Sequence, residues 1–87
     1  ILINEPILIS SGINSDIRYN YYYPRWAYDQ YREILKRFAK EHNIKYYDLW
    51  DLVPEANFTN SAIHLDLEGT LLLADEVERI IWEHCLP

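Results

Sequence analysis

Apolar residues follow two different periods along this chain, and together they predict strands and helices in alternation. The first nine residues, ILINEPILI, form a near-continuous apolar run that is typical of a strand buried on both faces of a parallel sheet. Pro6 has no N–H to give to a strand ladder, so we expect the strand itself to end near Asn4. Segment 10–20 is rich in Ser, Gly, Asn and Asp, which predicts a loop.

A helical period begins at Pro24, a residue type that suits the first turn of a helix. Apolar side chains then recur at helical spacing, at Ala27, Tyr31, Ile34, Leu35 and Phe38. Polar and basic residues occupy the other faces. The pattern predicts an amphipathic helix that ends near His42 and Asn43.

The second half of the chain repeats this order. Residues Ile44 to Leu49 predict a short strand, and residues 51–63, which include a proline, predict a loop. Asp66 is a suitable N-cap for a second apolar helix that reaches about His84. The result is one βαβα unit, for which right-handed crossovers are expected.

Two parallel strands and two helices are too few for a stable layered domain, because a parallel sheet needs cover on both faces and further strands. A chain of 87 residues also buries only about 60% of its unfolded surface. We therefore predict an α/β fold class and treat residues 1–87 as a single segment. We expect a βαβα fragment of a larger parallel-sheet domain. It either self-associates or forms the C-terminal part of a larger α/β domain.

Composition narrows the possible partners. The net charge of −6 argues against nucleic acid and anionic membranes, and no apolar run approaches the roughly 18 residues of a membrane span. A lone cysteine, Cys85, excludes an internal disulfide framework. His42 and His84 stand at predicted helix ends, where cations are favoured, and form no metal-ligand motif. We expect no metal site and no cofactor.

The candidate chemistry centres on His64. Ligands of open α/β sheets bind outside the carboxyl ends of the strands. Three segments are expected to meet there: Asn4-Glu5-Pro6, residues 48–51 and the loop that carries His64. A histidine on such a loop, just before a helix, has the residue type and pKa class of a general base. Asn4 and Glu5 are candidate substrate contacts.

The residues around His64 carry a family resemblance. The run IHLDLEG at 63–69, with the helix after it, resembles the last sequence block of the SGNH (GDSL-type) hydrolases. The preceding strand, aromatic loop, helix and strand match that family's final third. The resemblance implies an esterase, lipase or O-acyltransferase with a three-layer α/β/α, flavodoxin-like fold. In that fold residues 1–87 are the C-terminal part of a larger α/β hydrolase domain, and His64 is the general base. It also implies an ester or acylated-carbohydrate substrate and a nucleophilic serine upstream of Ile1, without which this chain is inactive.

The chain departs from the family pattern at two points. Ser61 occupies the position of the family's aspartate, three residues before His64, and Asn60 stands one residue further back. The Asn60 side chain can accept a hydrogen bond from the imidazole but cannot stabilise imidazolium by charge. An aspartate elsewhere is the alternative for orienting the histidine: Asp48, Asp51 or Asp66. The family's Gly-Asp-Ser block and its oxyanion-hole blocks are absent from these residues.

Two other interpretations remain open. In the first, the orienting acid is lost and the chain is a non-catalytic α/β module for binding or self-association through its aromatic residues, which are Trp26 and the tyrosines of segment 19–23. In the second, Asn4-Glu5-Pro6 is similar to the acid/base motif of (β/α)₈ glycosidases. The chain is far too short for such a barrel.

Overall fold

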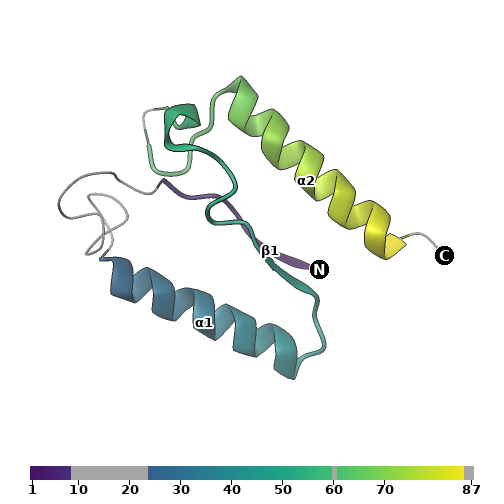
Figure 1. Cartoon of the computed structure of the whole chain (residues 1–87). Helices are drawn as coiled ribbons and strands as arrows, with labels where there is room; N and C mark the ends of the chain where they lie inside the picture. Colours follow the sequence, from purple (N-terminus) through teal and green to yellow (C-terminus); the bar gives the residue numbers. More distant parts are fainter. Residues whose placement is uncertain (9–23, 60, 86–87) are drawn as a thin grey trace.

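The predicted alternation of strands and helices is present in the computed structural model, which describes residues 1–8, 24–59 and 61–85 (Figure 1). The elements are strand β1 (Leu2–Asn4), helix α1 (Arg25–Glu41), strand β2 (Tyr46–Asp48), the 3₁₀ turn η1 (Glu55–Asn57) and helix α2 (Leu67–Cys85). The βαβα order is thus confirmed, and η1 interrupts the segment that was expected to be all loop.

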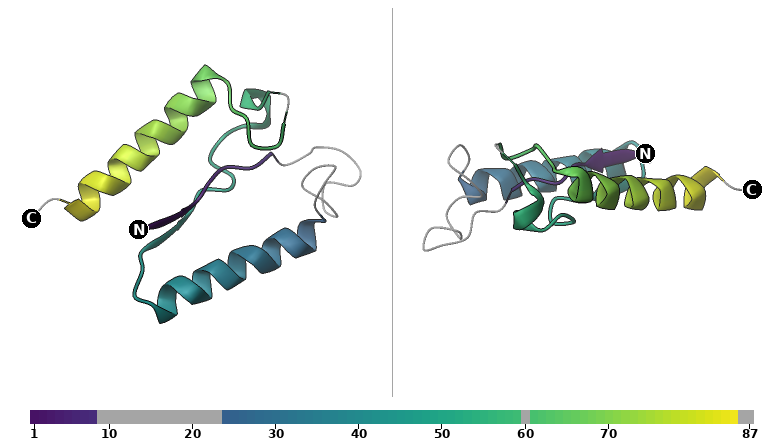
Figure 2. Two further views of the ribbon diagram at one scale, coloured as in Figure 1. Left: turned by 180° about the vertical axis from the view of Figure 1, so that it is seen from behind. Right: turned by 90° about the horizontal axis from the view of Figure 1, so that it is seen from above.

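The two strands pair in parallel, with Leu2 opposite Tyr46 and Asn4 opposite Asp48. The strand β1 ends before Pro6, as the missing N–H of proline requires. Both strands lie between α1 and α2 in the front and back views (Figures 1 and 2). The α/β class is therefore confirmed as a parallel strand pair between two helices.

The end of α1 is set by a residue in the left-handed region. Asn43 has φ 55°, a conformation that asparagine tolerates better than most residues. The N–H of Ile44 donates to the carbonyl of Ala39 at 2.8 Å, and that of Asn43 to Lys40 at 3.4 Å. This pair of bonds is the Schellman arrangement, which satisfies the last carbonyls of the helix and turns the chain into β2.

The start of α2 is capped as predicted. The Oδ1 atom of Asp66 accepts a hydrogen bond from the N–H of Gly69 at 2.8 Å. Asp66 also accepts from the side-chain amide of Asn57, and its own N–H donates to the Asn57 carbonyl at 2.9 Å. Asp66 therefore does two things, because it caps the first turn of the helix and holds that turn against η1.

Few apolar side chains are buried. Among the described residues the buried apolar set is Ile7, Ala39, Leu49, Val53 and Ile80. In the described part of the chain eleven large hydrophobic residues are exposed: Ile1 before β1, Ile63 beside His64, and nine on the two helices. The molecule measures 47 × 32 × 15 Å, and its radius of gyration of 14.2 Å exceeds the roughly 12 Å expected for a domain of this length. The chain is a thin slab whose apolar faces are only partly covered.

Substituting Gly69 with alanine tests the contact between α2 and the loop before it. A Cβ on Gly69 would lie 3.1 Å from Val53 Cγ1 and 3.2 Å from the Asn57 carbonyl oxygen. Val53 is buried and the Asn57 backbone is held by hydrogen bonds at both its N–H and its C=O, so neither can move easily. We expect Gly69→Ala to lower the free energy of unfolding by about 1 kcal/mol, measured by chemical denaturation.

The control for this substitution is Thr70→Gly, which places the opposite change at the next, exposed position of the same helix. It should lower stability by the ordinary helix-propensity difference and the loss of one exposed hydroxyl contact. A rise in stability for Gly69→Ala, the usual result inside a helix, would contradict the close packing described above.

Candidate functional site

A polar network joins the carboxyl ends of the two strands to α1. Asn4, only 7% exposed, donates one hydrogen bond from its amide nitrogen to the Tyr28 hydroxyl and another to Asp48 Oδ1, both at 2.9 Å. Arg32 Nε donates to Asp48 Oδ2 at 2.6 Å. Each oxygen of the Asp48 carboxylate is therefore bound by a different element, Asn4 from β1 and Arg32 from α1.

Arg32 also contacts Trp50, two residues beyond the end of β2. Its guanidinium carbon lies 4.5 Å from the centroid of the Trp50 ring, and its Nη1 is 3.3 Å from Asp29 Oδ1. A guanidinium can stack on an aromatic face while its edge donates to carboxylates. The network thus fixes the direction in which the chain leaves β2.

Backbone hydrogen bonds hold the loop that carries His64 on both of its sides. Phe58 and Leu65 form an antiparallel bridge, and the N–H of Thr59 donates to the carbonyl of His64 at 2.9 Å. The N–H of Leu8, beyond β1, donates to the carbonyl of Ala62 at 2.8 Å. His64 lies on a loop with its side chain exposed, as predicted, and its backbone is held in place.

A pocket of about 460 Å³ connects this loop to the end of β1 and the start of α1. Its lining residues are Asn4, Glu5, Ile7, Ala27, Tyr28, Tyr31 and Ile63. The Tyr28 and Tyr31 rings lie with centroids 5.9 Å apart, forming an aromatic wall. Desolvation raises the pKa of Tyr28 above its ordinary value, although the hydrogen bond from Asn4 acts in the opposite direction. Tyr28 is therefore a neutral phenol at physiological pH.

The predicted site residues have different surroundings. Glu5 is exposed at the pocket, whereas both amide hydrogens of Asn4 are used inside the network. The hydroxyl oxygen of Ser61 accepts a hydrogen bond from the N–H of Ile63 at 3.3 Å. Asn60 and the tyrosines of segment 19–23 lie outside the described residues. The convergence of the β1 end with the His64 loop is confirmed by the shared pocket and the bond between Leu8 and Ala62.

Sequence reasoning missed Tyr28, Arg32 and Trp50. One signal for the network was available in the sequence. Arg32 lies on the same helix face as the core position Ala39, and a charged side chain on a face that is partly buried needs a partner. The predicted strand end at Asp48 supplies that partner. The carboxylates of Asp48 and Asp66, both considered for orienting His64, are engaged by Arg32 and by the helix cap.

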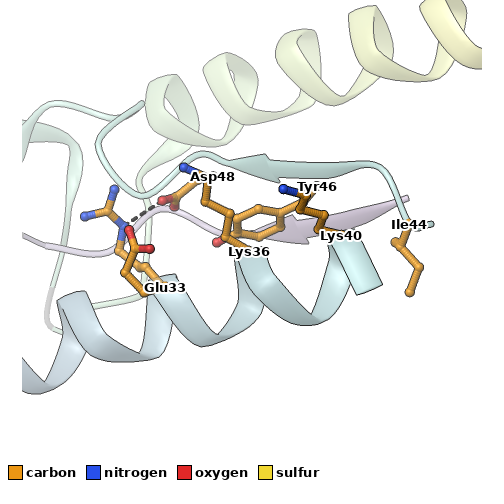
Figure 3. A pocket seen from close by; sticks show the side chains of 7 residues that line it. Glu33, Lys36, Lys40, Ile44, Tyr46 and Asp48 are labelled. Atoms are coloured by element: carbon orange, nitrogen blue, oxygen red, sulfur yellow. Dashed lines mark hydrogen bonds and ion pairs between the residues drawn. The ribbon is translucent and has the colours of Figure 1, made fainter. Parts of the chain in front are cut away.

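A second pocket, of about 370 Å³, lies along the other strand (Figure 3). Glu33, Lys36 and Lys40 project from α1 toward β2, which contributes Tyr46 and Asp48. The Tyr46 hydroxyl is buried and has no hydrogen-bond partner among the residues that the structure describes. Burial, with a smaller contribution from the Asp48 charge, raises the pKa of Tyr46 to about 12.

The other two histidines each contact one aromatic residue. The Nδ1 atom of His42 lies 2.9 Å from the Phe38 carbonyl, and its ring stacks on that of Phe38. His84 forms a hydrogen bond with the Tyr47 hydroxyl.

Within the described ranges, no group of three or more His, Cys, Asp or Glu residues is placed to hold a metal ion. Neither α1 nor α2 has the length and apolar content that crossing a membrane requires.

Comparison with known proteins yields no relative. No family model matches the chain, and no curated protein or solved structure does so.

The ionisation of Tyr46 should be visible in the pH dependence of stability. Because its pKa is raised to about 12 in the folded chain against 10.0 for an ordinary tyrosine, the unfolded chain releases this proton first as pH rises. The contribution of Tyr46 is therefore complete below pH 10 and is lost between about pH 10 and pH 12. Tyr46→Phe should make the stability fall less steeply across that range, measured by urea unfolding at each pH. An unchanged slope would contradict the burial of the hydroxyl.

Removing the charge of Asp48 should destabilise the fold. Asp48→Asn keeps the shape of the side chain but removes the carboxylate that Arg32 Nε contacts at 2.6 Å. The guanidinium, about a quarter exposed, then keeps only its longer contact with Asp29 as an ion pair. We expect the free energy of unfolding to fall by about 2 kcal/mol. The matched control is Asp51→Asn on the exposed segment that follows, which should change little. Equal effects of the two substitutions would show that the network does not hold the strands to α1.

Proposed function

We propose that this chain is the C-terminal part of an SGNH-like ester hydrolase or O-acyltransferase, with His64 as the catalytic general base. The observation that supports this most is the setting of His64. The exposed residue lies on a loop held by backbone hydrogen bonds, directly before a capped helix. Its neighbour Ile63 lines the pocket at the carboxyl end of β1. That end of a parallel sheet is where α/β enzymes bind their ligands.

To act as a general base, His64 needs a nucleophile whose proton it can take. A serine hydroxyl is a weak nucleophile at neutral pH, and an adjacent imidazole takes its proton and later returns it to the leaving alcohol. In the proposed enzyme the serine comes from a segment upstream of Ile1, and the strand pair between α1 and α2 belongs to a three-layer α/β/α domain. The reaction requires neither a metal nor another cofactor.

The substrate class follows from the pocket. Tyr28, Tyr31 and Ile63 offer apolar and aromatic surface, while Glu5 offers a carboxylate at the same pocket. Aromatic faces beside a hydrogen-bonding group suit an acyl chain or a sugar ring. These features support an ester or an acylated carbohydrate as the substrate.

The group that orients the His64 imidazole is proposed from the candidates that the sequence offers. Because the carboxylates of Asp48 and Asp66 are bound by other groups, the candidates are Asn60 and the exposed Asp51. In serine proteases, an asparagine in place of the orienting aspartate lowers kcat by about 10⁴-fold. The proposed enzyme is accordingly a slow one, or it uses an acid from elsewhere.

The proposal is tested in the complete gene product, which under this proposal includes a segment upstream of Ile1. We expect His64→Gln to lower kcat/KM for p-nitrophenyl acetate by about 10²- to 10⁴-fold and to slow labelling by a fluorophosphonate, because the serine loses its base. The matched control is His42→Gln, far along the chain at the end of α1, which should leave both rates unchanged. Equal activity of the His64→Gln and unmodified proteins would contradict the proposal.

A companion variant tests the orienting role of Asn60. Asn60→Asp should raise kcat/KM at least about tenfold if this side chain accepts the imidazole N–H, because a carboxylate also stabilises imidazolium. Ser61→Asp is the control at the position where the resembling family has its aspartate. A gain only for Ser61→Asp would assign the orienting position to residue 61, and no gain for either would remove both residues from the site.

A non-catalytic α/β module is the second candidate function. The observation that favours it is the extent of uncovered apolar surface, which includes Trp26 at 68% exposed and Leu67 at 76% exposed. Exposed patches of this kind mark interaction sites. This alternative predicts a protein that binds a partner or itself and shows no labelling by a fluorophosphonate.

A further inference from the structure

The outer edge of β1 has backbone groups with no strand beside them among the residues that the structure describes. The N–H of Leu2 donates to the Lys45 carbonyl, and the carbonyl of Asn4 accepts from the Leu49 N–H, so both residues turn these groups toward β2. Alternate residues of a parallel strand turn their backbone groups to opposite edges. The N–H and C=O of Ile3 therefore point to the other edge, where no described strand lies.

An apolar stripe on α1 flanks the same edge. We call it the α1 stripe, and it consists of Ala27, Tyr31, Ile34 and Phe38, which recur at helical spacing. Two of its members, Ala27 and Tyr31, share the 460 Å³ pocket with Asn4, Glu5 and Ile7 of the β1 segment. The stripe is therefore on the β1 side of the helix. Tyr31, Ile34 and Phe38 are 46–58% exposed, which leaves an apolar face without cover.

The outer edge of β2 has the opposite character. Glu33, Lys36 and Lys40 of α1 line the pocket along it, together with Arg32 (Figure 3). Charged side chains, lysine above all, are the usual protection of a sheet edge that faces solvent. The two edges of this sheet thus differ. Charged side chains lie along the β2 edge, whereas the β1 edge is open and has apolar side chains beside it.

We infer that the β1 edge and the α1 stripe together form the surface that receives a further α/β segment. This segment supplies a strand parallel to β1 and an apolar helix face against Ile34 and Phe38, and β2 remains the solvent edge. The inference rests on the proposed function for the origin of that segment, upstream of Ile1 in the same polypeptide.

Strand direction favours such a segment over a second copy of this chain. A two-fold axis through the β1 edge would pair two β1 strands antiparallel. The sheet present here is parallel, and sheets of one direction are over-represented. A parallel strand beside β1 would also lie next to the pocket that Asn4, Glu5 and Ile7 of the β1 segment share with Tyr31.

The test compares two matched double variants of the complete gene product. One carries Ile34→Gln with Phe38→Gln on the stripe, and the other carries Lys36→Gln with Lys40→Gln on the charged side of the same helix. All four side chains are exposed in the structure described here. If nothing covered the stripe, the two pairs would have similar, small effects. We expect the stripe pair to lower the midpoint of thermal unfolding by roughly 5–10 °C and the lysine pair by less than about 2 °C.

Amide hydrogen exchange of the unmodified gene product provides a measurement that needs no variant. A strand beside β1 would protect the Ile3 N–H, so the peptide that contains Ile3 should exchange slowly. Rapid exchange there, or equal thermal shifts for the two double variants, would overturn the inference. So would a dimeric gene product that the stripe pair converts to monomers, since a second copy would then cover the face.

These readouts measure stability and protection rather than turnover. Full activity of the His64→Gln protein would remove the proposed function, while the thermal shifts and the exchange of Ile3 would still report on the β1 edge. The two failures are therefore distinguishable.

Discussion

The carboxylate of Asp48 is the point on which this structure depends. One oxygen accepts from Asn4 on β1 and the other from Arg32 on α1, while Asp48 itself ends β2. Since a partly buried carboxylate is costly without such partners, the three elements are held in one register. Arg32 extends the constraint to Trp50 through its guanidinium face. The direction in which the chain leaves the sheet, toward η1 and the His64 loop, follows from this arrangement.

The two lateral sides of the molecule have different characters, and this difference links fold to function. Charged side chains of α1 lie along β2, whereas the α1 stripe, the open backbone groups of Ile3 and the pocket beside Ile63 lie along β1. The same feature that leaves the chain short of a core thus supports its proposed place as part of a larger α/β enzyme.

Much of the fold was predictable from local signals. Pro6 predicted the end of β1, Asp66 the start of α2 and Asn43 the end of α1, because each depends on a residue's own backbone or on neighbours within a turn. The polar network was not predictable, since Asn4 meets Tyr28 and Asp48 across 24 and 44 residues, and such pairs depend on strand register and helix rotation. The role of Asn4 as a substrate contact stays a prediction: Asn4 lines the 460 Å³ pocket, while both its amide hydrogens are used within the fold. The loop position of His64 was predicted correctly, whereas its catalytic role stays a prediction because the groups that would define it are not local to it.

The most direct measurement is a crystal structure of the complete gene product, with the upstream segment that the proposed function requires. We predict a strand paired in parallel with β1, and a serine hydroxyl within hydrogen-bond reach of His64, about 2.6–3.2 Å. A β1 edge that remains open to solvent, with no nucleophilic side chain near His64, would contradict it.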